Sequence, residues 1–140
     1  MKVLIDTNVI IDVLIKRNPH FESSAAFLKL CGNQITGLLA ASQTTDIFYL
    51  LRRKGKGAAE AKAVLQKLKS NIEIADVTSA DVENALESDM PDYEDALLAF
   101  IGQRNKAEWI VSRNEKDYAK SPIPALSPQA FIEKLLRNCR

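Results

Sequence analysis

The stretch VLIDTNVIID, residues 3–12, contains a short apolar run that breaks at an aspartate, Asp6. KVLI, at residues 2–5, is typical of a buried strand, and helical spacing follows it. In a second stretch, IVSRNEKDYA at residues 110–119, an apolar run leads into a polar turn that contains Asp117. An aspartate therefore stands at or soon after the end of each of two predicted strands.

Short apolar runs alternate with longer segments of helical period along the 140 residues. The predicted strands span residues 2–5, 35–40, 72–76, 109–112 and 123–126. The predicted helices span residues 8–17, 20–31, 43–54, 58–70, 79–88, 92–105 and the residues from 128 onward. This alternation predicts a three-layer α/β/α fold with a central, mainly parallel five-stranded sheet. Without a repeat or linker to divide it, the chain is expected to form one domain over residues 1–140.

Local signals predict where several helices begin. Pro19 suits the first turn of one helix, and Ser42 suits the N-cap of the next. Thr78 and Asp81 have the spacing of a capping box, and Pro128 suits the first position of the last helix.

The composition excludes several classes of function. The chain is 46% hydrophobic and 26% charged with a net charge of +1, which predicts a globular core without a strong global field. His20 is the only histidine, and its context, NPHFE, is typical of the start of a helix. A serine–histidine–aspartate triad, a cysteine–histidine pair and a histidine–cysteine zinc site are therefore disfavoured. The chemistry is expected to belong to carboxylates.

The cysteines and the apolar runs predict a cytoplasmic protein. Cys31 and Cys139 are far apart and neither belongs to a CxxC pair, so reduced thiols are expected. No apolar run approaches the ~18 residues of a membrane helix, and acidic and amide residues interrupt the run at 3–15, unlike a secretory leader. No membrane partner is expected.

Four aspartates fall at one predicted edge of the sheet. Asp6 follows the first strand, Asp46 lies one turn into the helix after the second, and Asp117 follows the fourth. Asp95 joins them because the helix that leads into the fourth strand must begin at that edge. In parallel α/β sheets, ligands bind beyond the carboxyl ends of the strands.

Each acid also has a purely structural interpretation. Asp6 could cap a helix, Asp117 could be a turn residue, and Asp92, Glu94 and Asp95 could complement a helix N-terminus. Their joint placement favours a site. Two unit charges ~4 Å apart repel by roughly 4 kcal/mol at an effective dielectric constant of about 20, so clustered carboxylates call for a cation. Their hard oxygen atoms suit Mg²⁺ or Mn²⁺.

Four motifs, in this order, resemble the PIN-domain family, the nuclease fold of VapC-type toxins. They are LIDTNVIID with Asp6, SQTTDIFYLLRR with Asp46, DYEDALLAF with Asp95, and SRNEKDY with Asp117. The resemblance covers nearly the whole chain. Three positions depart from the family pattern. Asp46 stands where glutamate is frequent, Ser112 stands in place of threonine, and Tyr118 in place of phenylalanine.

The resemblance implies metal-dependent hydrolysis of RNA, with Asp6, Asp46, Asp95 and Asp117 as the catalytic acids. Asp6, Asp95 and Asp117 would hold one or two Mg²⁺ (or Mn²⁺) ions. Asp46 would complete the shell or orient the attacking water. Four further residues are expected to orient the metal ligands without binding the metal themselves: Asn8, Asp92, Ser112 and Asn114.

An RNA substrate also needs cations for its phosphates. The stretch RRKGKG at residues 52–57 offers four, with a solvated helix end as the alternative: Arg52, Arg53, Lys54 and Lys56.

The resemblance further implies that the chain is the toxin of a toxin–antitoxin pair, with a small antitoxin protein as partner. A homodimer through the helices at 20–31 and 58–70 is an open alternative to burial of those helices within one chain. A PIN-like RNA- or protein-binding module without turnover is the competing function. A phosphatase is disfavoured because no D-x-D pair follows the first strand.

Overall fold

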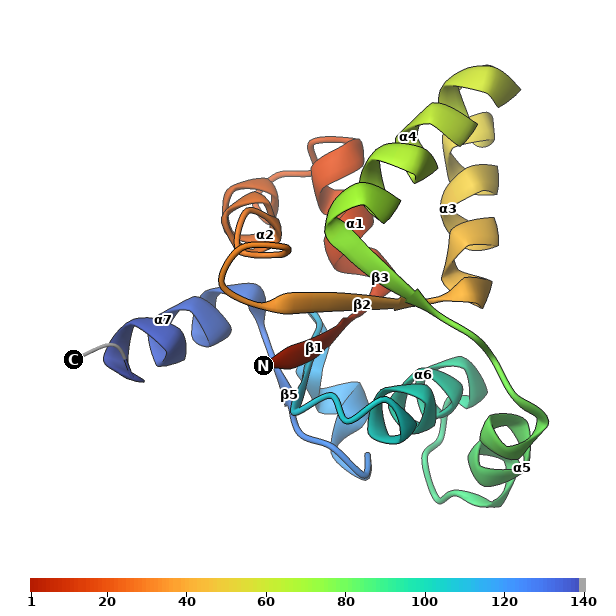
Figure 1. The fold of residues 1–140 in the computed structure, drawn as a ribbon, viewed down its shortest axis with the longest axis vertical. Helices are drawn as coiled ribbons and strands as arrows, with labels where there is room; N and C mark the ends of the chain where they lie inside the picture. Colours follow the sequence, from red (N-terminus) through yellow and green to blue (C-terminus); the bar gives the residue numbers. More distant parts are fainter. Residues whose placement is uncertain (139–140) are drawn as a thin grey trace.

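The computed structural model describes residues 1–138 and has a five-stranded sheet at its centre (Figure 1). The strands are β1 (Lys2–Ile5), β2 (Thr36–Ala40), β3 (Ile72–Ala75), β4 (Trp109–Val111) and β5 (Ala125–Leu126). They lie in the order β3-β2-β1-β4-β5, and every neighbouring pair is parallel. The predicted parallel five-stranded sheet is confirmed.

Helices cover both faces of this sheet, which confirms the three-layer architecture (Figure 1). The helices are α1 (Thr7–Leu14), α2 (Phe21–Leu28), α3 (Ala41–Arg53), α4 (Ala58–Asn71), α5 (Ser79–Glu87), α6 (Tyr93–Arg104), α7 (Pro128–Asn138) and the short 3-10 helix η1 (Glu115–Tyr118). The first four and α7 contribute to one hydrophobic cluster, and α5, α6 and η1 contribute to the other. Each face of the sheet therefore has its own core.

The central strand β1 divides its side chains between these two cores. Val3 and Ile5 belong to the cluster under α1–α4, whereas Leu4 belongs to the cluster under α6. All three side chains are fully buried. A strand with apolar residues on both faces must lie inside a sheet that is covered on both sides, and this explains the unbroken apolar run before Asp6.

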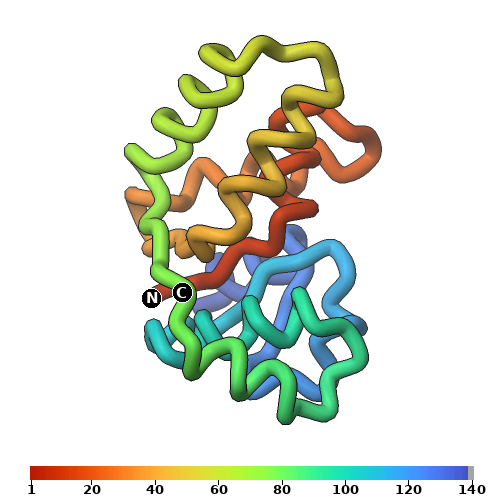
Figure 2. Tube along the Cα trace, turned by 90° about the vertical axis from the view of Figure 1, so that its right-hand side faces the viewer, coloured from red at the N-terminus to blue at the C-terminus, as the bar shows by residue number. Residues whose placement is uncertain are grey.

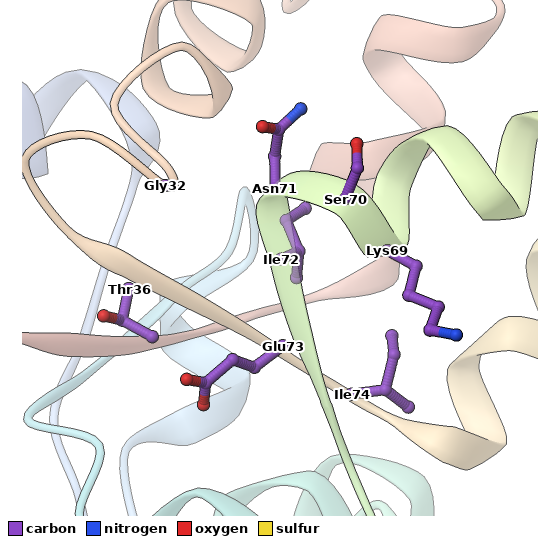
Figure 3. A pocket seen from close by; sticks show the side chains of 8 residues that line it. All are labelled: Gly32, Thr36, Lys69, Ser70, Asn71, Ile72, Glu73 and Ile74. Carbon is purple, nitrogen blue, oxygen red and sulfur yellow. The ribbon is translucent and has the colours of Figure 1, made fainter.

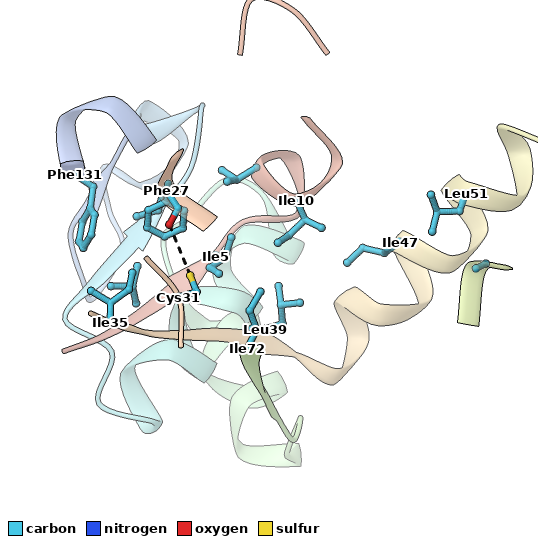
Figure 4. Packing of buried hydrophobic residues seen from close by; sticks show 14 residues of the cluster. Ile5, Ile10, Phe27, Cys31, Ile35, Leu39, Ile47, Leu51, Ile72 and Phe131 are labelled. Atoms are coloured by element: carbon cyan, nitrogen blue, oxygen red, sulfur yellow. Dashed lines mark hydrogen bonds between the residues drawn. The ribbon is translucent and has the colours of Figure 1, made fainter. Parts of the chain in front are cut away.

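The larger core is closed by an aromatic contact between two distant helices. The rings of Phe27 in α2 and Phe131 in α7 meet edge to face, with centroids 5.4 Å apart (Figure 4). Both side chains are buried. Cys31 lies beside them, with its Sγ 4.0 Å from the Phe27 carbonyl oxygen, and burial raises the pKa of this thiol to about 12. Cys139 lies outside the described residues.

Small residues let α6 lie close to the sheet. A Cβ on Gly102 would come within 2.9 Å of Ile123 and 3.5 Å of Leu4. Ala99 and Ala96, about one and two turns earlier in α6, are fully buried. This close packing fixes the helix that carries Asp95.

Two predicted helix starts are wrong, and two are confirmed. α3 begins at Ala41, because the Gln43 side chain accepts the Ala40 N–H at 2.7 Å, so Ser42 lies within the helix and does not cap it. α2 begins at Phe21, which leaves Pro19 in the preceding turn.

The capping box of α5 is present, with the Thr78 N–H donating to the Asp81 carboxylate at 2.9 Å and the Asp81 N–H donating back to the Thr78 hydroxyl at 3.3 Å. Pro128 is the first residue of α7, as predicted.

The helices α3 and α4 form an antiparallel hairpin that extends away from the sheet (Figures 1 and 2). Its inner part is anchored by Ile47, Leu51 and Ala61, which are fully buried in the larger core. Its outer turn, residues 52–56, is exposed. Within residues 1–138, no helix is long and apolar enough to cross a membrane.

The aromatic contact in the core generates a test of stability. Phe131→Ala should lower the free energy of unfolding by about 3–5 kcal/mol, because it removes a buried ring and leaves a cavity. Urea denaturation followed by circular dichroism would measure it. Leu136→Ala in the same helix removes a side chain that is 63% exposed and should change stability by no more than ~0.5 kcal/mol. Equal effects of the two substitutions would contradict this account of the core.

Candidate active site

Asp6 lies at the centre of an acidic site at the carboxyl edge of the sheet. Its Oδ2 accepts hydrogen bonds from the Ser112 hydroxyl at 2.8 Å and from the Tyr118 hydroxyl at 2.9 Å. Asp6 does occupy the N-cap position of α1, but its side chain makes no capping hydrogen bond. The carboxylate instead connects the end of β1 to the segment after β4, so the helix-cap interpretation of Asp6 is wrong.

Tyr118 links two of the predicted acids. Its hydroxyl lies 2.9 Å from Asp6 Oδ2 and 3.3 Å from Asp95 Oδ1, and the residue is only 3% exposed. Burial and the two carboxylates raise the pKa of Tyr118 far above its ordinary range. The phenol therefore stays protonated and serves as a donor to the acids. From the sequence, Tyr118 was noted because it stands in place of phenylalanine. The role of its hydroxyl group was not predicted.

Asp95 carries the clearest electrostatic perturbation of the site. Burial, followed by the charges of Asp92 and Asp6, raises the pKa of Asp95 to about 6, and the charge of Asp117 adds to the effect. The hydrogen bond from Tyr118 acts in the opposite direction. Burial and the nearby carboxylates thus disfavour the charged form of Asp95.

Asp46 lies at this edge but is paired with a residue that the sequence did not single out as a site residue. Burial, together with the charge of Asp46 and a hydrogen bond to it, raises the pKa of Glu94. Asp46 and Glu94 line a shared pocket of about 490 Å³ beside α3. The charges of Asp92 and Asp6 also raise the pKa of Glu94, so Asp46 and Glu94 form an outer pair that adjoins an inner group of acids around Asp6. The run DYED contained the signal, because Glu94 precedes Asp95 at the start of α6.

Asp117 and Asp92 take part in different ways. Asp117 lies on η1, is exposed, and acts on Asp95 through its charge. Asp92 is the N-cap of α6, where its side chain accepts the Asp95 N–H at 2.9 Å. The structural interpretation of Asp92 is therefore correct, although its negative charge also contributes to the site.

The predicted neutral positioning residues form a hydrogen-bond network behind Asp6. Asn8 Nδ2 lies 3.4 Å from the Ser112 hydroxyl, and Asn8 Oδ1 accepts the Arg113 N–H at 3.3 Å. Asn114 reaches Ser112 through its backbone N–H, at 3.0 Å, and not through its side chain. This network holds Ser112 in place to donate to Asp6.

A buried ion pair, which the sequence did not reveal, anchors the same loop. Arg113 Nε lies 2.7 Å from Oδ2 of Asp12, a fully buried carboxylate in α1. Ser24 donates to the same oxygen at 3.2 Å, and Arg17 Nε is 4.0 Å from Oδ1. Within residues 1–138, Asp12 Oδ1 and Arg113 Nε have no well-aligned hydrogen bond, so charge attraction dominates. The only signal in the sequence was an aspartate on the apolar side of α1.

The carboxylate oxygens of the site have the chemistry that a hard divalent cation requires. They are not close enough together to form a complete coordination shell. Within residues 1–138, no three aspartate, glutamate, histidine or cysteine side chains converge closely enough to form a metal site. Asp6 Oδ1 nevertheless has no hydrogen-bond partner among those residues, because both donors use Oδ2. Carboxylate oxygens that repel one another are suitable ligands for Mg²⁺ or Mn²⁺. The predicted ligand set of Asp6, Asp95 and Asp117 stays a prediction.

Another pocket, of about 500 Å³, lies at the opposite edge of the sheet (Figure 3). It is lined by the starts of β2 and β3, including Thr36 and Ile72. Its one carboxylate, Glu73, lies 3.9 Å from the exposed Lys2 amine. A single exposed carboxylate cannot support the chemistry of paired acids, so the acidic edge is the stronger candidate site.

The predicted RNA-binding cations are exposed at the outer end of α3 and in the turn after it. Arg53 lines the pocket that contains Asp46. Arg52 Nη1 instead donates to the Lys56 carbonyl at 3.2 Å, across the turn. Only one of the four cations therefore lines a pocket next to the acids, and the phosphate-binding role of all four stays a prediction.

The sequence matches the PIN domain family over residues 2–116. That match spans most of the chain and includes Asp6, Asp46 and Asp95. The chain belongs to the PIN domain family.

Known proteins of similar sequence and fold agree with this assignment. Ribonuclease VapC1 of Aquifex aeolicus (strain VF5) is 28% identical over 141 residues, covering 95% of this chain and 94% of that protein. The fold is similar to that in VapBC2 of Rickettsia felis bound to a promoter DNA fragment, with a TM-score of 0.70 and 19% identity over 91% of this chain and 98% of that one.

It is also similar to the fold in a toxin–antitoxin complex from Klebsiella pneumoniae, with a TM-score of 0.68 and 19% identity over 90% of this chain and 97% of that one. A third similar structure is VapC20 of Mycobacterium tuberculosis, a toxin that cleaves the sarcin-ricin loop, with a TM-score of 0.65 and 12% identity over 87% and 98%. At these identities, the solved structures support the fold alone.

The buried ion pair behind the site predicts a large effect of a single truncation. Arg113→Ala should lower the free energy of unfolding by about 3–5 kcal/mol, because it leaves the buried Asp12 carboxylate without its closest cation. Arg17→Ala is the matched control, since that side chain is 42% exposed and its Nε lies 4.0 Å from the same carboxylate. It should have an effect below ~1 kcal/mol in the same urea titration. A small effect of Arg113→Ala would mean that the ion pair contributes little.

The raised pKa of Asp95 predicts how stability depends on pH without metal. The folded-state pKa of about 6 exceeds the ordinary value of about 3.9, so the folded state holds this proton more tightly. The resulting stabilisation is complete below the ordinary value and is lost as the pH rises through about 6. Asp95→Asn lacks this proton.

In EDTA, the wild-type protein should therefore lose stability relative to Asp95→Asn between about pH 4 and pH 6. Urea unfolding at a series of pH values would measure the difference, with Glu83→Gln, an exposed acid on α5, as the control. A difference between wild type and Asp95→Asn that is constant with pH would show that Asp95 has an ordinary pKa in the folded protein.

Proposed function

We propose that this protein is a metal-dependent endoribonuclease that hydrolyses RNA phosphodiester bonds. One observation supports this most strongly: Asp6 and Asp95, which both lie within hydrogen-bond distance of the Tyr118 hydroxyl, are at the carboxyl edge of a PIN-domain sheet with further acids around them. The relative named Ribonuclease VapC1, which aligns with 95% of the chain, supports the same activity.

Asp6, Asp95 and Asp117 are the residues that would hold Mg²⁺ or Mn²⁺. When bound, the metal lowers the pKa of a water molecule and neutralises charge on the reacting phosphoryl group. Ser112 and Tyr118 orient Asp6 through its Oδ2, which leaves Oδ1 available as a ligand. The site acids thus receive their orientation from buried hydroxyl groups.

Asp46 and Glu94 would act beside this inner group. Because its pKa is raised, the Glu94 carboxyl holds a proton more readily than an ordinary glutamate. It is therefore suited to donate a proton or a hydrogen bond close to the reacting phosphate. Asp46, which lines the same pocket as Glu94, would position water or complete the metal shell.

We further propose that the protein is the toxin of a toxin–antitoxin pair that acts in the cytoplasm. The solved relatives include a toxin–antitoxin complex of similar fold. A small antitoxin protein would inhibit the enzyme by placing an arginine against the carboxylates, where charge-assisted hydrogen bonds compete with the metal. A homodimer through α2 and α4 stays a prediction.

Substitution of the inner acids tests the proposed activity. Asp6→Asn and Asp95→Asn should each reduce Mg²⁺-dependent cleavage of RNA by at least about 100-fold, because even residues that only support a ligand contribute ~10–100-fold. Asp46→Asn should reduce it less. Glu83→Gln removes an exposed acid elsewhere and should leave cleavage unchanged. Gel assays of RNA cleavage with Mg²⁺, Mn²⁺ or EDTA would measure these rates.

Two results would reject parts of this assignment. Full activity of both Asp6→Asn and Asp95→Asn would show that the site lies elsewhere. RNA binding by the wild type without cleavage in either metal would favour a binding module.

A further inference from the structure

The pocket beside the acids is lined by acidic, aromatic, apolar and basic side chains. It holds about 490 Å³ and lies along α3, with Asp46 and Glu94 at one end and Arg53 in its lining. Tyr49 contributes an aromatic ring to the lining, and Leu50 contributes an apolar side chain. The pocket therefore joins an acidic group, an apolar surface and a cation within one groove.

The helical spacing places three of these residues in a row. Asp46, Tyr49 and Arg53 are three and four residues apart, so they share one face of α3. Over the seven residues from Asp46 to Arg53, an α-helix rises about 10.5 Å. Because α3 begins directly after the carboxyl end of β2, the row runs from the acidic edge of the sheet toward the exposed outer turn. Figure 1 shows this course of α3.

Tyr49 presents its ring to solvent. It is 60% exposed, although it lies in a helix whose inner face is buried. Its ring meets that of Phe48 edge to face, with centroids 5.1 Å apart and planes at 89°. An exposed ring that is held by a neighbouring aromatic side chain offers a face on which a nucleobase can stack.

The guanidinium groups of Arg53 and the adjacent Arg52 differ in their hydrogen bonding. Arg52 donates to the Lys56 carbonyl at 3.2 Å. Among residues 1–138, the Arg53 side chain forms no hydrogen bond or ion pair, even though Asp46 and Glu94 line the same pocket. Its guanidinium is therefore free to bind an external anion, and phosphate is an anion that arginine recognises well.

We propose that this groove is a subsite for single-stranded RNA that binds the nucleotide next to the cleaved bond. A base stacks on Tyr49, and the phosphate beyond it contacts Arg53, while the phosphate to be cleaved lies at the acids. The order of charge, ring and charge along α3 matches the alternation of phosphate and base along a strand. This inference rests on the proposed ribonuclease function and adds to it the side chains that hold the substrate.

Two pairs of variants separate this subsite from general attraction to a cationic surface. Arg53→Ala and Arg52→Ala remove the same charge from adjacent positions of one helix. Tyr49→Leu removes the ring but keeps an apolar side chain, whereas Tyr49→Phe keeps the ring. In each pair, the first variant should weaken RNA binding more than the second.

The experiment measures binding and turnover of a fluorescein-labelled single-stranded RNA of twelve uridines. Anisotropy in EDTA at several KCl concentrations gives Kd, and cleavage in Mg²⁺ gives KM and kcat. Tyr49→Leu should raise Kd and KM about fivefold or more, because it removes a stacking contact. Arg53→Ala should weaken binding and reduce the slope of log K against log salt by about 0.7, the value for one phosphate contact of a single strand. Both should leave kcat nearly unchanged. Tyr49→Phe should keep Kd within about twofold of wild type, and Arg52→Ala should weaken binding less than Arg53→Ala does.

Other outcomes would overturn the proposal in distinguishable ways. Equal effects of Arg53→Ala and Arg52→Ala would show that only overall charge matters. If the wild type cleaves RNA and both Tyr49→Leu and Arg53→Ala bind it normally, the subsite is wrong while the ribonuclease function stands. If these variants lose affinity only for a protein partner, the groove belongs to that partner. If the wild type neither binds nor cleaves RNA, the proposed function fails as well.

Discussion

The two hydrogen bonds that Asp6 Oδ2 accepts connect the parts of the chain on which the site depends. The Ser112 hydroxyl comes from the residue after β4, and the Tyr118 hydroxyl comes from η1. The same Tyr118 hydroxyl lies within 3.3 Å of Asp95 at the start of α6. A single carboxylate oxygen thus brings together segments separated by more than a hundred residues, at the edge where parallel strands β1 and β4 end. The hydrogen bond from Tyr118 lowers the pKa of Asp95 and so partly offsets the repulsion between the acids.

Much of this arrangement followed from local patterns. Apolar runs and turn signals predicted five parallel strands, because a strand that is buried on both faces must be apolar throughout. The placement of Asp6, Asp95 and Asp117 at one edge then followed from strand direction alone. Helix ends were less predictable. Gln43, and not Ser42, satisfies the backbone at the start of α3, since it also donates to the Ile5 carbonyl at 2.8 Å across the sheet.

Contacts between distant segments could not be predicted in the same way. The pair of Asp12 and Arg113 joins residues a hundred positions apart, and nothing in either local pattern names the other. The hydroxyl of Tyr118 acquires its role only because η1 turns it toward Asp6. Glu94 belongs to the site because the first turn of α6 faces α3 and meets Asp46 there. In each case the chemistry depends on tertiary geometry, which residue spacing does not encode.

The outer part of the α3–α4 hairpin differs in packing from the region that carries the acids. The acids around Asp6 are attached to buried strands and closely packed helices, so their positions are tied to the integrity of the whole domain. The outer turn of the hairpin is exposed, and few constraints of packing act on residues 52–56. Loops and exposed elements of this kind tolerate sequence change far better than cores do. If RNA lies along α3 as proposed, substitutions in the exposed part of the hairpin change the contacts with RNA and leave unaltered the buried strands and packed helices that carry the acids.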